Sequence, residues 1–270
     1  MIINWSSNRS KVIEFEGDIT NYQMAERHGI YINATVGNRM GDMYSIGFQK
    51  VEDPASPYFG QQVFNEEGRF VGTPNIIKVG NYNPDWLAGI RNTFTYKNFN
   101  FSFLFDTRQG GEIFSETFVV GLEAGQLIET LEGRADGYDL SKPGNGVIGK
   151  GVIQNPDGSY RVNDVQLTAR EYHQSRTGNR DIPQGAVFDA SFVKLRELRL
   201  GYTVSPKLLS RIKVSALNIS LVARNLAVWS DVPHIDPETS SLAGGTIIPG
   251  VESVGMPTTR SIGFNLGFNF

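Results

Sequence analysis

The glycine series Gly144, Gly146 and Gly149 is the pattern with the greatest promise for chemistry, because its spacing matches a dinucleotide-binding fingerprint. That fingerprint works only between a strand and a helix whose N-terminus binds the pyrophosphate. Here Leu-Ser-Lys-Pro precedes the glycines, and the pair Asn155-Pro156 soon after them prevents a helix. We therefore interpret the series as a flexible loop and expect no cofactor.

Histidine is the residue most often used for metal binding and proton transfer, and the chain has three. His28, His173 and His234 lie far apart in the sequence and lack the spacing of metal ligands. We interpret each of them as a loop or surface residue and expect no metal site.

Two carboxylates, Asp236 and Glu238, flank Pro237. A carboxylate pair could hydrolyse a glycosidic bond, but this needs a cleft and a raised pKa on one member. Neighbouring acids on a proline-stiffened loop serve structure or form a weak cation site more often, and we favour structure. The sequence also has no Gly-x-Ser-x-Gly elbow, no phosphate-binding P-loop and no His-Glu-x-x-His motif. We therefore predict that the chain is not an enzyme and has no catalytic residue.

Aromatic residues outside the regular segments could stack on sugars or mark the level of a membrane interface. The candidates for sugar stacking are Tyr58, Phe59, Tyr82, Trp86, Tyr138, Tyr160 and Trp229. For Trp86, Tyr96, Tyr202 and Trp229, which lie beside predicted strand ends, we favour an aromatic girdle. For Tyr58, Tyr138 and Tyr160 both alternatives stay open.

The composition narrows the class of protein that must position these residues. The 270 residues carry a net charge of −3, which argues against nucleic-acid binding, and they include no cysteine. No apolar run approaches the roughly 18 residues of a transmembrane helix, although membrane β-barrels need no such run. The first residues are not a signal peptide, so we expect either that one was removed or that the chain is a fragment.

Period-two alternation of apolar and polar residues over residues 86–108 predicts a β-hairpin with Lys97 and Asn98 at its turn. Four phenylalanines line one face of its second strand: Phe99, Phe101, Phe103 and Phe105. An Arg on the lipid face near mid-membrane costs about 2–4 kcal/mol, so the opposite, charged face should line a wet lumen. The predicted lumen-facing charges are Arg91, Lys97, Asp106, Arg108 and, from a later strand, Arg224. A soluble sandwich that buries the phenylalanines against a second sheet explains this hairpin equally well.

The end of the sequence favours the membrane barrel over the sandwich. Apolar residues at positions 262, 264, 266, 268 and 270 alternate with serine, glycine and asparagine, and the chain ends on an aromatic residue. A final strand of this kind resembles the signal for assembly of outer-membrane barrels, with Phe264, Phe268 and Phe270 as its aromatic residues. A terminal aromatic residue in a soluble protein would usually be frayed and exposed.

Further elements complete the predicted order of hairpin, long loop, hairpin, long loop and final strand, with the long loops at one end of the barrel. Strands are predicted at residues 29–36, 43–51, 192–202 and 213–225, and a helical turn at 205–210. The faces of the strand 192–202 stay unassigned, because Lys194 and Arg196 share a face with Leu198 and Leu200. Inside the loops we predict small hairpin turns at 65–68 and 155–158 and short helices within 113–134 and 167–175.

Several motifs, in order, resemble the C-terminal part of SusC/RagA-like TonB-linked outer-membrane transporters. They are GNYNPDW at residues 80–86 with 103–111, ASFVKLRELRLGY at 190–202, ARNLAVW at 223–229, IDPE at 235–238, GMPTTR at 255–260 and the terminal Phe270. The resemblance covers most of the chain from about residue 75 onward.

The resemblance implies an all-β fold of antiparallel strands: about seven or eight strands of a transmembrane barrel of about 22, with long extracellular loops that contain short helices and hairpins. Residues 1–270 would form the C-terminal portion of the barrel domain, without the plug domain and the earlier strands. The implied function is TonB-powered uptake of oligosaccharides or peptides across the bacterial outer membrane. The implied partners are a SusD-like surface lipoprotein, the TonB complex through the N-terminal part, the lipid and the substrate.

The resemblance also implies limits and leaves rivals. So few strands cannot close so wide a barrel, and a lipid bilayer does not accept open sheet edges, so we expect that the fragment alone does not transport. One rival is a passive binding or adhesion barrel whose long loops are the active surface. The other is a soluble sugar-binding β-sandwich.

Overall fold

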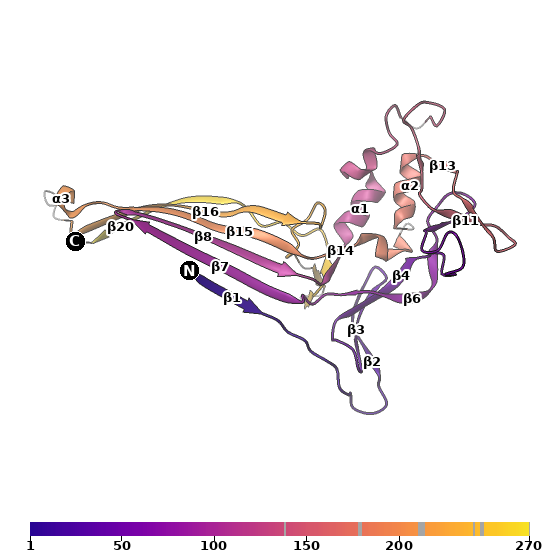
Figure 1. Cartoon of the computed structure of the whole chain (residues 1–270), viewed down its shortest axis with the longest axis horizontal. Helices are drawn as coiled ribbons and strands as arrows, with labels where there is room; N and C mark the ends of the chain where they lie inside the picture. Colours follow the sequence, from indigo (N-terminus) through magenta and orange to yellow (C-terminus); the bar gives the residue numbers. More distant parts are fainter. Residues whose placement is uncertain (138, 178–179, 210–213, 240, 244–245, 270) are drawn as a thin grey trace.

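The computed structural model describes the chain except for residues 138, 178–179, 210–213, 240, 244–245 and 270 (Figure 1). The predicted roles of Tyr138 and Phe270 therefore lie outside the described residues. Figure 1 shows two parts: a long sheet that extends to one side, and a loop body of helices and short strands at one end of that sheet. No helix among the described residues has the length and apolar character needed to cross a membrane.

The long sheet has six strands, and every neighbouring pair is antiparallel. In spatial order they are β1 (Ile2–Ser6), β7 (Trp86–Tyr96), β8 (Phe99–Gln109), β15 (Phe192–Thr203), β16 (Ala216–Ser230) and β20 (Ser261–Asn269). The connections β7–β8 and β15–β16 lie at the far end, whereas the connections β8–β15 and β16–β20 run through the loop body (Figure 1). The predicted all-β antiparallel fold and the predicted order of hairpins, long loops and final strand are thus confirmed.

The number of strands in this sheet differs from the expected seven or eight. The strands predicted at 29–36 and 43–51 do pair with each other, but they belong to a separate four-stranded sheet in the loop body. No position of β3 or β4 is fully exposed and more than half are buried, because the two strands pack inside that body and not in a two-faced wall. Strand β1, by contrast, was not predicted, because five residues are too short for a period-two pattern to stand out.

One face of the six-stranded sheet is apolar across all six strands. The register aligns Trp5 with Ala88, Phe94 with Phe101, Phe101 with Leu200, Leu200 with Leu221, and Leu221 with Phe264. Apart from the partly buried Ala88, these side chains are exposed, with Trp5 at 67% and Phe264 at 66%. An exposed apolar surface of this extent marks a contact with lipid or with another protein. No second sheet covers this face among the described residues, which argues against the soluble sandwich (Figure 1).

A β-bulge in β15 explains why the faces of this strand could not be assigned from the sequence. The register shifts between Leu195 and Glu197, against both neighbouring strands. An extra residue reverses the alternation of side chains beyond it. Val193 and Leu195 therefore share the apolar face with Leu198, although their spacing in the sequence places them on opposite faces of a regular strand.

The loop body contains small sheets and short helices. Its sheets are β2 (Asn21–Arg27), β3 (Ile30–Thr35), β4 (Asp42–Phe48) and β6 (Gly72–Asn81); β12 (Tyr160–Val162), β11 (Val152–Gln154) and β5 (Val63–Phe64); β14 (Val187–Asp189), β9 (Glu112–Ser115) and β19 (Val251–Glu252); β10 (Val147–Ile148) and β13 (Gln166–Leu167); and β17 (Ser241–Ala243) and β18 (Thr246–Ile248). The helices are α1 (Glu116–Ala124), α2 (Ala169–Arg176) and the 3-10 helices η1 (Ile128–Leu131) and η3 (Pro183–Ala186), and α3 (Pro206–Leu209) lies at the far end of the long sheet.

Local sequence explains where the main helices begin and end. The Ser115 hydroxyl accepts a hydrogen bond from the backbone N–H of Phe118 at the start of α1, and Gly125 ends α1 in the left-handed conformation. Helix α2 begins with a capping box between Thr168 and Glu171. The short helices predicted within 113–134 and 167–175 and the helical turn predicted at 205–210 are therefore confirmed.

The main apolar core lies in the loop body and not on the long sheet. Helix α1 packs Phe118 and Leu122 against Ile32 and Met43 of the four-stranded sheet and against Val251. The two parts of the chain thus have opposite arrangements: the loop body buries its apolar side chains within itself, whereas the long sheet exposes them. The long sheet therefore needs an apolar environment from outside the described residues.

We predict that Leu198→Arg destabilises the protein in a lipid bilayer by about 2–4 kcal/mol, because it places a charge on the apolar face near the middle of β15. Urea unfolding in liposomes measures this. Thr93→Arg, on the opposite face of β7, is the matched control and should cost far less. Equal losses for the two variants would contradict the assignment of the faces.

Candidate functional site: the charged face of the long sheet

The face opposite the apolar one carries four of the five charges predicted to face a lumen. On β8, Leu104, Asp106 and Arg108 lie on the face opposite the phenylalanines. Leu104 is aligned with Arg91 of β7 and with Glu197 of β15, so these two residues lie on the same face. Arg224 is aligned in turn with Glu197. These positions share one face, although whether that face lines a lumen stays a prediction.

Lys97 differs from the other four predicted charges. It lies in the two-residue turn between β7 and β8 with φ of 51°, and its Nζ sits 5.3 Å from the centroid of the Tyr96 ring. Because Lys97 and Arg91 are both odd-numbered, regular alternation predicted that they share a face. Alternation stops where the strand ends, and β7 ends at Tyr96. Lys97 therefore belongs to the far end of the sheet and not to its charged face.

Glu197 is an acidic residue of this face that the sequence did not reveal. Its Oε1 lies 3.6 Å from Nη2 of Arg91, and its Oε2 lies 3.3 Å from Nε of Arg224. The carboxylate thus connects strands on either side of β15. Because Glu197 directly follows the bulge, regular alternation from Lys194 would have placed it on the apolar face.

Arg108 ties the loop end of β8 to the loop body. Its Nη2 donates to the backbone oxygen of Tyr82 at 2.5 Å, and its Nε donates to the backbone oxygen of Gly110 at 3.4 Å. The chain turns sharply here, with positive φ at Gly110 and Gly111. Arg108 therefore stabilises this turn, in addition to its place on the charged face.

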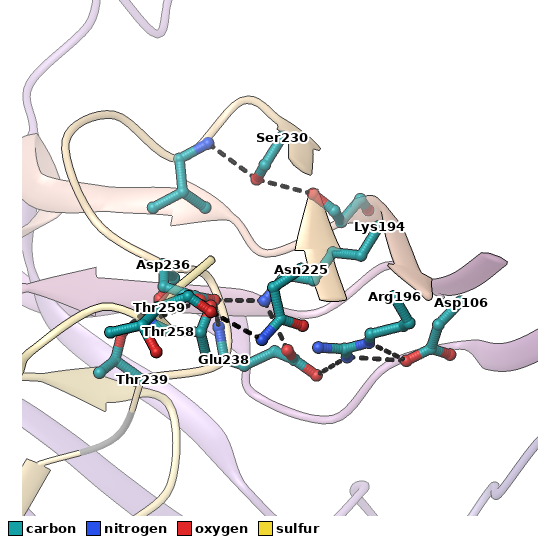
Figure 2. A network of polar contacts seen from close by, with 12 residues as sticks. Asp106, Lys194, Arg196, Asn225, Ser230, Asp236, Glu238, Thr239, Thr258 and Thr259 are labelled. Carbon is teal, nitrogen blue, oxygen red and sulfur yellow. Dashed lines mark hydrogen bonds and ion pairs between the residues drawn. The ribbon is translucent and has the colours of Figure 1, made fainter. Parts of the chain in front are cut away.

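Next to Arg108 the face ends in a compact group of five charged residues: Asp106, Lys194, Arg196, Asp236 and Glu238, which we term the junction cluster (Figure 2). Lys194 Nζ lies 2.5 Å from Asp236 Oδ1 and 2.5 Å from Glu238 Oε2. Arg196 Nη2 lies 2.5 Å from Glu238 Oε1 and 2.7 Å from Asp106 Oδ2. The cluster therefore joins β8 and β15 to the long connection between β16 and β20.

Local sequence shapes the acidic side of the junction cluster. Pro237 separates the two acids, the backbone N–H of Glu238 donates to Asp236 Oδ1 at 3.0 Å, and the backbone N–H of Thr239 donates to the backbone oxygen of Asp236 at 2.9 Å. The Thr258 hydroxyl also donates to the Asp236 carboxylate. This turn presents both carboxylates to the basic side chains of β15.

The bulge supplies the basic side of the cluster. Arg196 is the extra residue that the register skips, and its guanidinium reaches Asp106 and Glu238 on the charged face. Asn225 of β16, with φ of 53°, lies where β16 is irregular opposite the bulge, and its Nδ2 donates to the Thr259 backbone oxygen at 3.1 Å. Irregular backbone in two strands thus directs polar side chains into one cluster (Figure 2).

The contacts of the cluster are those of a structural network of ion pairs. Burial acts to raise the pKa of Asp236, but the hydrogen bonds from Lys194 and Thr258 outweigh it and lower the pKa to about 2. Burial likewise acts to raise the pKa of Glu238, and bonds from Arg196 and Lys194 outweigh it and lower that pKa. A glycosidase acid needs a raised pKa instead. The structural interpretation of the acids beside Pro237 is therefore the one that the geometry supports.

The three histidines meet different partners. His28 Nε2 lies 2.5 Å from Glu116 Oε1, His234 Nε2 lies 2.7 Å from Glu129 Oε2, and His173 Nε2 lies 3.3 Å from the backbone oxygen of Glu132. No group of three metal-binding side chains occurs among the residues that the structure describes. The glycines at 144, 146 and 149 are followed by short strands and not by a helix, as predicted.

The aromatic residues expected to form a girdle lie near the two ends of the long sheet, on its apolar face. Trp86 and Trp229 are near the loop end, and Tyr96 and Tyr202 are near the far end. Two aromatic levels on the lipid side are typical of a transmembrane barrel. Tyr58 and Tyr160, for which two alternatives were open, are partly buried and pack against a small apolar core around Val51.

Removal of one carboxylate from the junction cluster should loosen the loop body at its attachment. Asp236→Asn removes one of the two carboxylates that pair with Lys194, whose side chain is only 4% exposed, and leaves Glu238 as the remaining carboxylate. Breaking a buried pair completely costs about 3–5 kcal/mol, and the retained Glu238 keeps the loss below that range. We expect faster hydrogen exchange over residues 231–239, measured by mass spectrometry on the protein in its membrane. Asp231→Asn, an exposed change in the same segment, should leave exchange unchanged, and equal effects would contradict the role of the cluster.

The lowered pKa of Asp236 also predicts a pH dependence. Because the folded pKa is below the unfolded value of about 3.9, the stabilisation is complete above that value and is lost as the pH falls through about 2. The fluorescence of Trp229, with Trp5 and Trp86 replaced by phenylalanine, should therefore stay constant from pH 7 to about 4 and change below it. A transition centred near pH 6 would instead point to a histidine.

Comparisons with known proteins agree with this geometry. No family model matches the sequence. TonB-dependent receptor P26 of Formosa agariphila is 27% identical over 216 residues, which are 78% of this chain and 20% of that protein. TonB-dependent receptor P3 of the same organism is 23% identical over 88% of this chain and 23% of its own length. The chain thus spans about a fifth of the length of these relatives.

Solved structures show the same fold. A structure of the RagAB peptide transporter matches with a TM-score of 0.61 and 16% identity, over 98% of this chain and 26% of that one. The RagAB peptide importer in its open-open state matches with a TM-score of 0.58 and 14% identity, over 99% and 26%. These relatives are receptors and transporters of the bacterial outer membrane. Over most of its length, the chain therefore resembles the TonB-dependent receptors in sequence and has the fold of part of the RagAB transporter.

Proposed function

We propose that residues 1–270 form the C-terminal portion of the barrel of a TonB-dependent outer-membrane transporter that imports oligosaccharides or peptides. The observation that carries the proposal is the continuous apolar face of six antiparallel strands, opposite a face with paired charges. A sheet that meets lipid on one side and water on the other has this arrangement. The comparisons support the same class of protein.

The six strands contribute one part of the barrel wall. Strands β1 and β20 lie at the edges of the sheet, and each is paired on one side only among the described residues. Because a bilayer does not accept open edges, these strands must meet further strands in the membrane. The chain alone then does not transport, and the activity belongs to the closed barrel.

The charged face lines the water-filled interior in this proposal. Arg91, Asp106, Arg108 and Arg224 contact the hydrated passage or a plug within it. An ionised side chain costs more free energy on a lipid face than on a water-filled lumen face. Lys97 has no part in this lining, because it lies in a turn at the end of the sheet.

The loop body then lies on the outer side of the membrane, since barrels of this class have long loops outside and short turns in the periplasm. A SusD-like lipoprotein contacts these loops from outside, and the TonB complex acts from the periplasm. The likeness to RagAB, a peptide transporter, supports this arrangement. It also makes peptides a substrate class to test beside oligosaccharides.

Uptake into whole cells distinguishes this function from a passive binding barrel. Cells that produce the complete receptor should accumulate a labelled oligosaccharide or oligopeptide, and a protonophore or deletion of the TonB gene should abolish accumulation. Surface binding of the label should persist under both treatments. Accumulation that is indifferent to both treatments would contradict the proposed energy coupling and favour a passive barrel.

A further inference from the structure

The loop end of β16 is a place where the long sheet lacks a neighbouring strand. Strand β16 pairs with β15 up to Ser230, whereas its pairing with β20 ends at Arg224 and Ser261. Outside the ladder with β15, residues 225–230 make no backbone–backbone hydrogen bond with any described residue. Every second residue of this stretch therefore directs its backbone N–H and C=O groups to an open edge.

Local sequence explains why the ladder between β16 and β20 stops. Asn225 has a left-handed backbone with φ of 53°, and its side-chain Nδ2 donates to the Thr259 backbone oxygen at 3.1 Å in place of a backbone donor (Figure 2). Pro257 has no N–H group to donate. The Thr258 hydroxyl donates to the Asp236 carboxylate, which holds this segment at the junction cluster. The segment that leads into β20 thus departs from β16 and leaves its edge uncovered.

A cavity of about 460 Å³ lies between β16 and the departing segment, and we term it the edge cavity. Residues 225–228 of β16 line it together with Pro257, Thr258 and Arg260. Because consecutive side chains of a strand point to opposite faces, a cavity bordered by four residues in a row extends along the edge of the strand. Its volume lies within the range of about 300–1,000 Å³ that is typical of ligand pockets.

One charged side chain of the edge cavity has no partner. The Lys194 and Asp236 side chains, which also line the cavity, pair with each other at 2.5 Å, and the His234 ring pairs with Glu129. The Arg260 guanidinium, by contrast, makes no hydrogen bond or ion pair with any residue that the structure describes. Arg260 directly precedes β20, so this free cation lies where the ladder with β16 begins.

We infer that the edge cavity binds the C-terminal end of a substrate peptide, which extends the sheet as a strand beside β16. An extended peptide supplies the backbone N–H and C=O groups that the open edge lacks, and strand addition of this kind is a common mode of peptide recognition. A peptide in line with β20 runs antiparallel to β16, so its C-terminus meets Arg260. A planar carboxylate matches the fork of that guanidinium group.

The same features favour a peptide over an oligosaccharide as the occupant. An oligosaccharide has no backbone N–H groups with the spacing of a strand, and sugar rings commonly stack on aromatic side chains. The described residues that line the edge cavity include no phenylalanine, tyrosine or tryptophan. The inference rests on the proposed transport function, and it narrows the proposed substrates to peptides with a free carboxyl terminus.

Calorimetric titration of the complete receptor in detergent tests the inference with N-acetyl-tetraalanine as the probe. The free acid should bind at least about tenfold more tightly than its C-terminal amide, which loses the charge-assisted hydrogen bond to Arg260. Two further analogues carry N-methyl groups at alternate peptide nitrogens, in complementary positions. Only one of them should lose binding, because every second N–H of an added strand faces β16. Maltotetraose should not displace the free acid.

Arg260→Gln should remove the preference for the free acid, and no ion pair or hydrogen bond within the described chain is lost in this variant. Arg9→Gln is the matched control, because Arg9 is also exposed and does not line the edge cavity. Absence of binding, equal binding of acid and amide, equal binding of the two N-methylated analogues, displacement by maltotetraose or an unchanged preference in Arg260→Gln would overturn the inference. A receptor that fails these tests but still shows TonB-dependent uptake refutes only the peptide site, whereas loss of TonB dependence refutes the proposed function.

Discussion

The separation of the long sheet into an apolar and a charged face is the constraint on which the rest of the structure depends. Side chains alternate between the faces of a strand, so each of six strands must keep the same phase as its neighbours for the separation to hold. The register achieves this from Trp5 at one edge to Phe264 near the other. Such a sheet is stable where lipid contacts its apolar face and water contacts its charged face.

The junction cluster connects this sheet to a loop body that is built on a different principle. The loop body buries Phe118 and Met43 in its own core, as a soluble domain does, whereas the sheet depends on its surroundings. The bulge in β15 places Arg196 beside Lys194 on the charged face, where both meet the acids of the long β16–β20 connection. Their attraction fixes the loop body over the end of the sheet and keeps the paired charges away from lipid.

Sequence alone was sufficient wherever structure follows local alternation, and insufficient where an irregularity changes it. The hairpin of β7 and β8 and the phase of β20 were predicted because period two is unbroken there. The faces of β15 and the role of Glu197 could not be predicted, because the bulge reverses the alternation of side chains. The three-residue step from Leu195 to Leu198 was the only sign of the bulge in the apolar pattern. The ion pairs of Asp236 connect residues far apart in the chain, and only the fold brings them together.

Collision accessibility of single spin labels tests most directly whether the two faces meet lipid and water. The chain has no cysteine, so single cysteines introduced at Phe101, Phe103, Arg91 and Arg224 carry the labels without interference. In outer-membrane vesicles, labels at the phenylalanine positions should collide with dissolved oxygen and be shielded from a water-soluble nickel complex, and labels at the arginine positions should show the reverse. Oxygen-accessible arginine positions with nickel-accessible phenylalanine positions would contradict the transmembrane wall and the transport function built on it.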